Sequence, residues 1–143
     1  MKKLIIIPIS IILFACHSMK KSSENKVVGS SLYTVLYQSN YQGRDSEENV
    51  VVHNQEDLND LFNSVGNDEI PKVDFSKNQV VALFLGTKNT GGYSISIDRV
   101  EEEAEKLVLY KKEETPKGGG VTMALTNPFI IAEIHSKKEI VFR

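Results

Sequence analysis

The chain of 143 residues contains one cysteine, no tryptophan and three histidines. A single cysteine cannot form a disulfide within the chain, so packing alone must stabilise the fold. The 17 basic and 19 acidic residues nearly balance, which excludes the strongly basic character typical of nucleic-acid-binding proteins. The longest mainly apolar stretch, residues 4–15, is too short for a transmembrane helix, which needs about 20 residues.

The N-terminus has instead the three parts of an export signal. Lys2 and Lys3 form a positively charged start, and residues 4–15 form an apolar core. The small residue Ala15 occupies the position before a cleavage site. We therefore expect residues 1–15 to be a lipoprotein signal peptide that is removed after export.

Cys16 would then be the first residue of the mature chain, where its thiol and the new amino group can both be acylated. Two or more acyl chains anchor a protein stably, whereas one chain does so only marginally. The sequence predicts a lipoprotein of the bacterial cell envelope, anchored through Cys16 to a membrane that we expect to be the outer membrane. The alternative is a cleaved secretory signal followed by an incidental cysteine.

The mature chain divides into a tether and one domain. Without Lys2 and Lys3 it has 15 basic and 19 acidic residues, a net charge of −4. Residues 16–31 carry Ser, Lys, Asn, Glu and Gly and have too few apolar side chains to form a core, so we expect a flexible lipid tether. Residues 32–143 are enough for one self-sufficient domain.

The pattern of apolar residues in this domain is mainly that of strands. One helix is predicted over residues 55–65, with Asn54 as its N-cap, and Gly66 ends it. Strands are predicted over residues 32–37, 50–52, 79–85, 93–100, 106–111, 121–125, 129–135 and 139–142. The run 80–85 is apolar on both sides and so belongs in the middle of a sheet. We expect a mainly β (α+β) fold: an antiparallel sandwich or small barrel of about six to eight strands, covered by one helix.

Two glycine-bearing loops connect these strands, at residues 88–92 and 116–120. Neither precedes a helix, so neither resembles a phosphate-binding loop. Their glycines either shape hairpin turns or leave bare backbone that receives a partner. Pro128 marks a further turn or bulge, which gives Phe129 a fixed direction, into the core or toward a partner. The predicted contact residues are Asn89, Thr90, Gly91, Gly92, Tyr93, Gly118, Gly119, Gly120 and Phe129.

No motif of an enzyme is present in the sequence. His17, His53 and His135 are scattered, and no pair has the spacing of metal ligands. No serine lies in a Gly-x-Ser-x-Gly elbow. We therefore expect a non-catalytic protein without a metal or another cofactor.

Several segments carry a family resemblance. Residues 73–76, 80–86 and 91–97 resemble the C-terminal domain family of the protease complex subunit PrcB. Residues 41–43 and 127–131 are similar to recurrent segments of that family in the same order, so the resemblance extends over residues 33–143. It implies a membrane-anchored accessory subunit that binds an exported protein and assembles or stabilises a protease complex, so a peptidase is one candidate partner.

The sequence is also compatible with two other functions. Residues 89–93 and 118–120 are similar in kind and order to two loops of chagasin-like protease inhibitors, whose β-sandwich inserts its end loops into a protease cleft. The chain lacks the proline of the first of those loops and has no Arg-Pro-Trp segment. A structural envelope lipoprotein without a protease partner is the other alternative.

Overall fold

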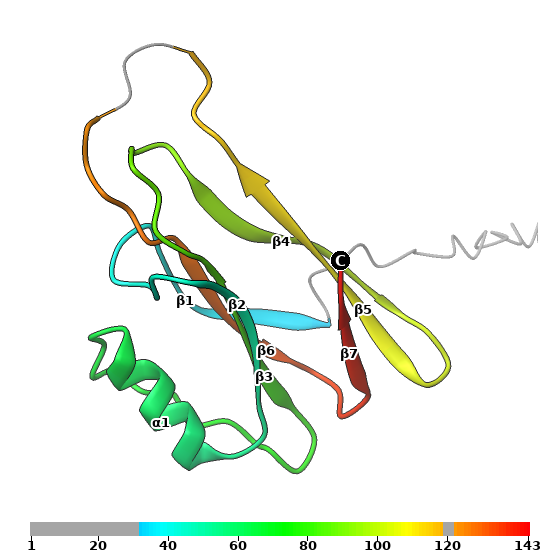
Figure 1. Cartoon of the computed structure of the whole chain (residues 1–143). Helices are drawn as coiled ribbons and strands as arrows, with labels where there is room; N and C mark the ends of the chain where they lie inside the picture. Colours follow the sequence, from blue (N-terminus) through cyan, green and yellow to red (C-terminus); the bar gives the residue numbers. More distant parts are fainter. Residues whose placement is uncertain (1–31, 119–121) are drawn as a thin grey trace, which may run out of the picture.

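The computed structural model describes residues 32–118 and 122–143, which form two β-sheets and one helix (Figure 1). The predicted signal peptide, the predicted tether and Cys16 lie outside the described residues. Within the described ranges, no helix has the length and apolar character that a membrane crossing requires. The described elements are β1 (Tyr33–Ser39), β2 (Glu47–Val52), α1 (Gln55–Ser64), β3 (Gln79–Leu85), β4 (Ser94–Glu102), β5 (Lys106–Glu114), β6 (Phe129–Ile134) and β7 (Glu139–Phe142).

The larger sheet has four strands in the order β1-β6-β3-β2, and all neighbours are antiparallel. β3 lies inside this sheet, and all seven of its residues are buried. Its side chains alternate between the two faces, so Val81 and Leu83 contact one core while Val80 and Ala82 contact another. This double burial confirms the central position predicted from its continuous apolar run.

The smaller sheet has three strands in the order β4-β5-β7, with β7 parallel to β5. It packs against β3 and β6 through a shared core that includes Leu107 and Leu109 of β5. On one side, the Tyr33 hydroxyl and the Gln38 side-chain amide of β1 donate hydrogen bonds to main-chain carbonyls of β4, at 3.3 and 2.8 Å. The two sheets form a sandwich and not a closed barrel.

α1 covers the opposite face of the larger sheet (Figure 1). It begins where Asn54 Oδ1 accepts a hydrogen bond from Asp57 N at 2.8 Å, as its N-cap position predicts. Leu58, Leu61 and Phe62 are buried against β3 and β6. The molecule therefore has three layers, with the larger sheet in the middle.

One predicted strand is wrong. Residues 122–125 are not in a strand, and only the next residue, Thr126, forms an isolated bridge, with Lys88. Val121 lies outside the described residues. The apolar and β-branched side chains of this segment suggested a strand, but Met123 and Leu125 are exposed and have no neighbouring strand to pair with. β2 and β5 are longer than predicted, and the other elements lie within two residues of their predicted bounds.

Candidate protein-binding surface

Three connections meet at one end of the sandwich, which we call the loop end (Figure 1). They are residues 40–46 between β1 and β2, residues 86–93 between β3 and β4, and the connection from β5 to β6. The structure describes residues 115–118 and 122–128 of the last connection. Both predicted glycine loops are among them, so the fold brings together segments that are far apart in the sequence.

Asn127 joins the three connections. Its side-chain amide nitrogen donates to Thr87 Oγ1 at 2.8 Å and to Asp45 Oδ1 at 3.3 Å. Its main-chain N–H donates to the carbonyl of Asn40, and its carbonyl accepts from Gly43 N, each at 3.0 Å. One residue thus holds the first connection, the second connection and the start of β6 in a fixed arrangement.

Thr126 adds a second link between the β3–β4 and β5–β6 connections. Its main chain exchanges two hydrogen bonds with Lys88, at 2.8 and 3.0 Å. Its side chain is 1% exposed, and its hydroxyl donates to the carbonyl of Thr90 at 3.1 Å. Because a buried hydroxyl with a partner is costly to disrupt, this contact further orders the loop end.

Gly91 and Gly92 allow these connections to approach closely. A Cβ atom on Gly91 would lie 2.3 Å from Thr122 Oγ1, and Gly91 N donates to the carbonyl of Thr122 at 3.0 Å. Gly92 has a φ of +89°, and a Cβ atom there would lie 2.9 Å from the Cβ of Pro116. The close packing of the connections therefore explains why both positions are occupied by glycine.

Exposed apolar side chains gather at the same end. The large hydrophobic residues that are exposed in the described ranges are Val35, Tyr41, Met123 and Leu125, and all except Val35 belong to the loop end. Met123 is 93% exposed and Leu125 is 67% exposed. The braced loops therefore present apolar side chains to the solvent.

The structure places the predicted contact residues in different environments. Asn89 is exposed, whereas the ring of half-buried Tyr93 lies 5.7 Å from Lys88 Nζ. Gly118 is exposed with a φ of +84° and has open space around it, while Gly119 and Gly120 lie outside the described residues. The loop end thus contains the predicted residues 89–93 and Gly118. It also contains Tyr41, Met123 and Leu125, which were not predicted from the sequence.

Phe129 requires a correction. Its side chain is 0% exposed, and its ring lies 5.7 Å from that of Phe84 and 5.4 Å from that of Tyr37, measured between centroids. The bend at Pro128 directs Phe129 into the core below α1, so the side chain is not part of the surface that a partner would meet. Of the two directions left open by the sequence, the core is the observed one.

Surface ion pairs and hydrogen bonds explain the perturbed titratable groups. A hydrogen bond from Lys111 lowers the pKa of Glu47, and hydrogen bonds to Glu101 and Asp98 raise the pKa of Arg99. Within residues 32–118 and 122–143, no cluster of three or more His, Cys, Asp or Glu side chains could hold a metal ion. All the groups with a resolved pKa shift lie outside the described residues of the loop end.

The comparison with protein families agrees with the resemblance. The family model described as PrcB C-terminal matches residues 79–135. This segment runs from the start of β3 to the end of β6, so it includes two of the three connections at the loop end. No curated protein and no solved structure is significantly similar to the chain.

Proposed function

Because residues 79–135 match the family model described as PrcB C-terminal, we propose that this protein is a non-catalytic accessory subunit that binds an exported protein. The resemblance to the PrcB family implies a protease complex subunit, so an exported peptidase is the first candidate partner. In this proposal the chain is a lipoprotein of the cell envelope, held at the membrane by acyl chains on Cys16.

The loop end is the proposed contact surface. The observation that supports it is the exposure of Met123 and Leu125 on a segment that hydrogen bonds order at both Thr122 and Thr126. Burying such side chains against a partner is favourable, at about 25 cal/mol for each Å² of apolar surface. Because the supporting loops are already ordered, association would lose less conformational entropy than it would with flexible loops.

Introducing a negative charge on this apolar surface tests the proposal. Met123→Glu and Leu125→Glu place a carboxylate at positions that are exposed in the free protein, so both variants should fold normally. Tagged full-length protein would be purified from detergent-solubilised envelopes, and the co-purified proteins would be identified by mass spectrometry. We expect the partner to be lost, or its recovery to fall about tenfold or more, in both variants.

Val35→Glu is the matched control, because Val35 is also an exposed apolar residue, 45% accessible, but lies on β1. It should recover the same partner as the unaltered protein. If all three variants recovered equal amounts of every partner, the loop end would not be the contact surface. Gly91 and Gly92 would then be explained by their role in shaping the loops alone.

Membrane attachment is tested separately. Cys16→Ser removes the thiol that acylation requires, so the variant should move from the membrane fraction to the soluble fraction of the envelope. The unaltered chain should carry acyl chains on its first residue, visible by mass spectrometry of the N-terminal peptide. A mature N-terminal peptide that begins at Cys16 without acyl chains would contradict the lipid anchor without affecting the contact surface.

A further inference from the structure

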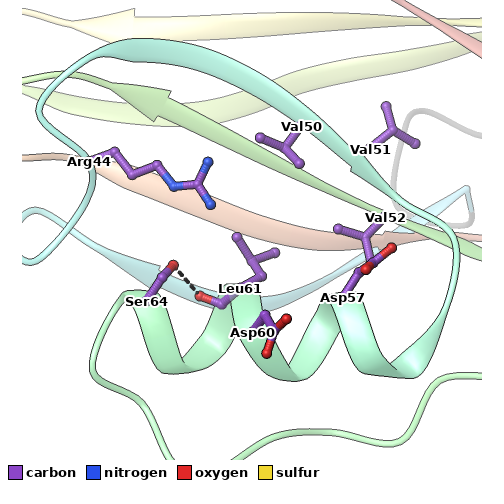
Figure 2. A pocket seen from close by; sticks show the side chains of 8 residues that line it. All are labelled: Arg44, Val50, Val51, Val52, Asp57, Asp60, Leu61 and Ser64. Carbon is purple, nitrogen blue, oxygen red and sulfur yellow. Dashed lines mark hydrogen bonds between the residues drawn. The ribbon is translucent and has the colours of Figure 1, made fainter.

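A groove lies between β2 and α1, on the side of the molecule where the larger sheet ends (Figure 2). Its volume is about 390 Å³. Figure 2 shows the valine side chains of β2 along one wall and the polar side chains of α1 along the other. The lining residues are Arg44, Val50, Val51, Val52, Asp57, Asp60, Leu61 and Ser64.

The wall formed by β2 has an unpaired edge. In the sheet order, β2 is the last strand, and its only neighbour is β3. Leu85 N donates a hydrogen bond to the carbonyl of Pro128, on the β6 side of β3. The backbone groups of successive residues in a strand point to opposite sides. The odd-numbered residues of β3 therefore form hydrogen bonds with β6, and the even-numbered residues form them with β2. The backbone groups of Asn49 and Val51 therefore point to the open edge, where no described strand pairs with them.

This edge differs from the β4 edge of the smaller sheet. The open side of β4 is partly covered, because side chains of β1 donate to its carbonyls at Ile95 and Ile97. No such cover is found along Asn49 and Val51 within the described residues. An exposed strand edge beside a helix is the arrangement in which proteins bind an extended peptide as an added strand.

The charges of the groove select the kind of peptide. α1 contains Glu56, Asp57 and Asp60 and no basic residue. The one cation of the lining, Arg44, is already paired with Glu48 at 2.8 Å, and its guanidinium lies 4.8 Å from the centre of the Phe84 ring. Asp57 and Asp60 therefore make the α1 wall of the groove negative, while the valines of β2 make the opposite wall apolar.

We propose that this groove binds an extended peptide segment that adds to β2 as a strand and places a Lys or Arg beside an apolar residue. Side chains two positions apart in a strand point to the same side, so one can meet Val50 and Val52 while the next meets Asp57 or Asp60. This site is distinct from the loop end, and it does not depend on the function proposed above.

Solution NMR with two blocked hexapeptides tests the site in the chain of residues 16–143 with Cys16→Ser. One peptide has the sequence Thr-Val-Thr-Lys-Thr-Val, and in the other Glu replaces Lys. We expect the Lys peptide to bind about fivefold more tightly than the Glu peptide, because surface charge pairs are individually weak. The amide signals of Asn49 and Val51 should shift more than those of Val50 and Val52, which are bonded to β3.

Two variants separate the site from a general charge effect. Asp60→Lys should weaken binding of the Lys peptide about fivefold, whereas Glu56→Lys changes the same charge on the same helix but outside the groove and should have little effect. Asn49→Pro removes the N–H that points to the open edge, so it should abolish strand addition. The variant should still fold, because proline is tolerated on edge strands where the N–H faces the solvent. Leu125→Glu should leave binding unchanged.

Other occupants would overturn the proposal. A dimer in sedimentation that Asn49→Pro dissociates would show that a second copy covers the edge. An increase in peptide affinity on Lys26→Glu would show that the chain's own N-terminal segment occupies the groove. Absence of binding at millimolar concentration, or equal binding of both peptides, would also contradict it.

Discussion

Phe84 stacks on Phe129 with ring centroids 5.7 Å apart and an interplanar angle of 23°. The two residues face each other across β3 and β6, in the register that pairs these strands. This contact lies directly behind the loop end, because Pro128 and Asn127 precede Phe129. The core below α1 and the arrangement of the three connections are thus joined through one short segment.

Replacing Phe129 with Ala should therefore lower the free energy of unfolding by about 3–5 kcal/mol, because it leaves a cavity between β6 and α1. Chemical denaturation followed by circular dichroism measures this change. Tyr41→Ala is the control, since Tyr41 is 57% exposed and its truncation should change the stability by less than about 0.5 kcal/mol. Equal stability of the two variants would contradict the core role of Phe129.

Gly91→Ala should destabilise the protein by about 1 kcal/mol, because the new methyl group would overlap Thr122 Oγ1 and force this exposed side chain into another rotamer. Thr122→Ala removes that oxygen, and the remaining Thr122 Cβ would lie 3.7 Å from the new methyl group, an ordinary contact. The double variant should therefore recover most of the stability lost in Gly91→Ala. A double-mutant cycle by denaturant unfolding measures this coupling, and strictly additive effects would contradict the close packing of the two loops.

Asn127→Ala should cost about 1–2 kcal/mol, because it leaves Thr87 and Asp45 without the amide that joins them. The variant should also exchange the amide hydrogens of residues 87–91 faster, since this connection loses its link to β6. Asn89→Ala is the matched control: Asn89 is exposed in the same connection, and its side chain has no hydrogen-bond partner among the described residues. Similar losses in both variants would show that Asn127 does not order the loop end.

The sequence predicts well those features that depend on neighbouring residues. The helix was predictable because its N-cap contact joins Asn54 to Asp57, three positions away. β3 was predictable because its unbroken apolar run requires cover on both faces. The family resemblance was likewise carried by local segments, and the family match confirms it over residues 79–135.

The remaining features depend on partners that are distant in the sequence. Thr122 and Leu125 have the residue types of a strand, but a strand also needs a neighbour, and here only Thr126 finds one. The bond from Asn127 to Asp45 spans 82 positions, so no local pattern could indicate it. For the same reason, the sequence identified the glycine loops as candidates but could not identify the exposed Met123 beside them.

The ion pair between Glu47 and Lys111 links β2 of one sheet to β5 of the other, with Lys111 Nζ and Glu47 Oε1 2.6 Å apart. The hydrogen bond from Lys111 lowers the pKa of Glu47 below its ordinary value of 4.5. Folding therefore favours the ionised carboxylate, so its stabilising contribution is fully present above pH 4.5. This contribution is lost as the pH falls through the lowered pKa of the folded state.

Glu47→Gln should accordingly lower the free energy of unfolding at pH 7, by less than about 1 kcal/mol because Glu47 is half exposed. The difference between the two proteins should shrink as the pH is lowered from 5 to about 3, because the unaltered protein then loses its charge as well. Urea unfolding at a series of pH values measures it. Glu69→Gln is the control, an exposed glutamate with no ion pair among the described residues. A Glu47→Gln difference that stayed constant down to pH 3 would show that the pair between the sheets does not act through the charge of Glu47.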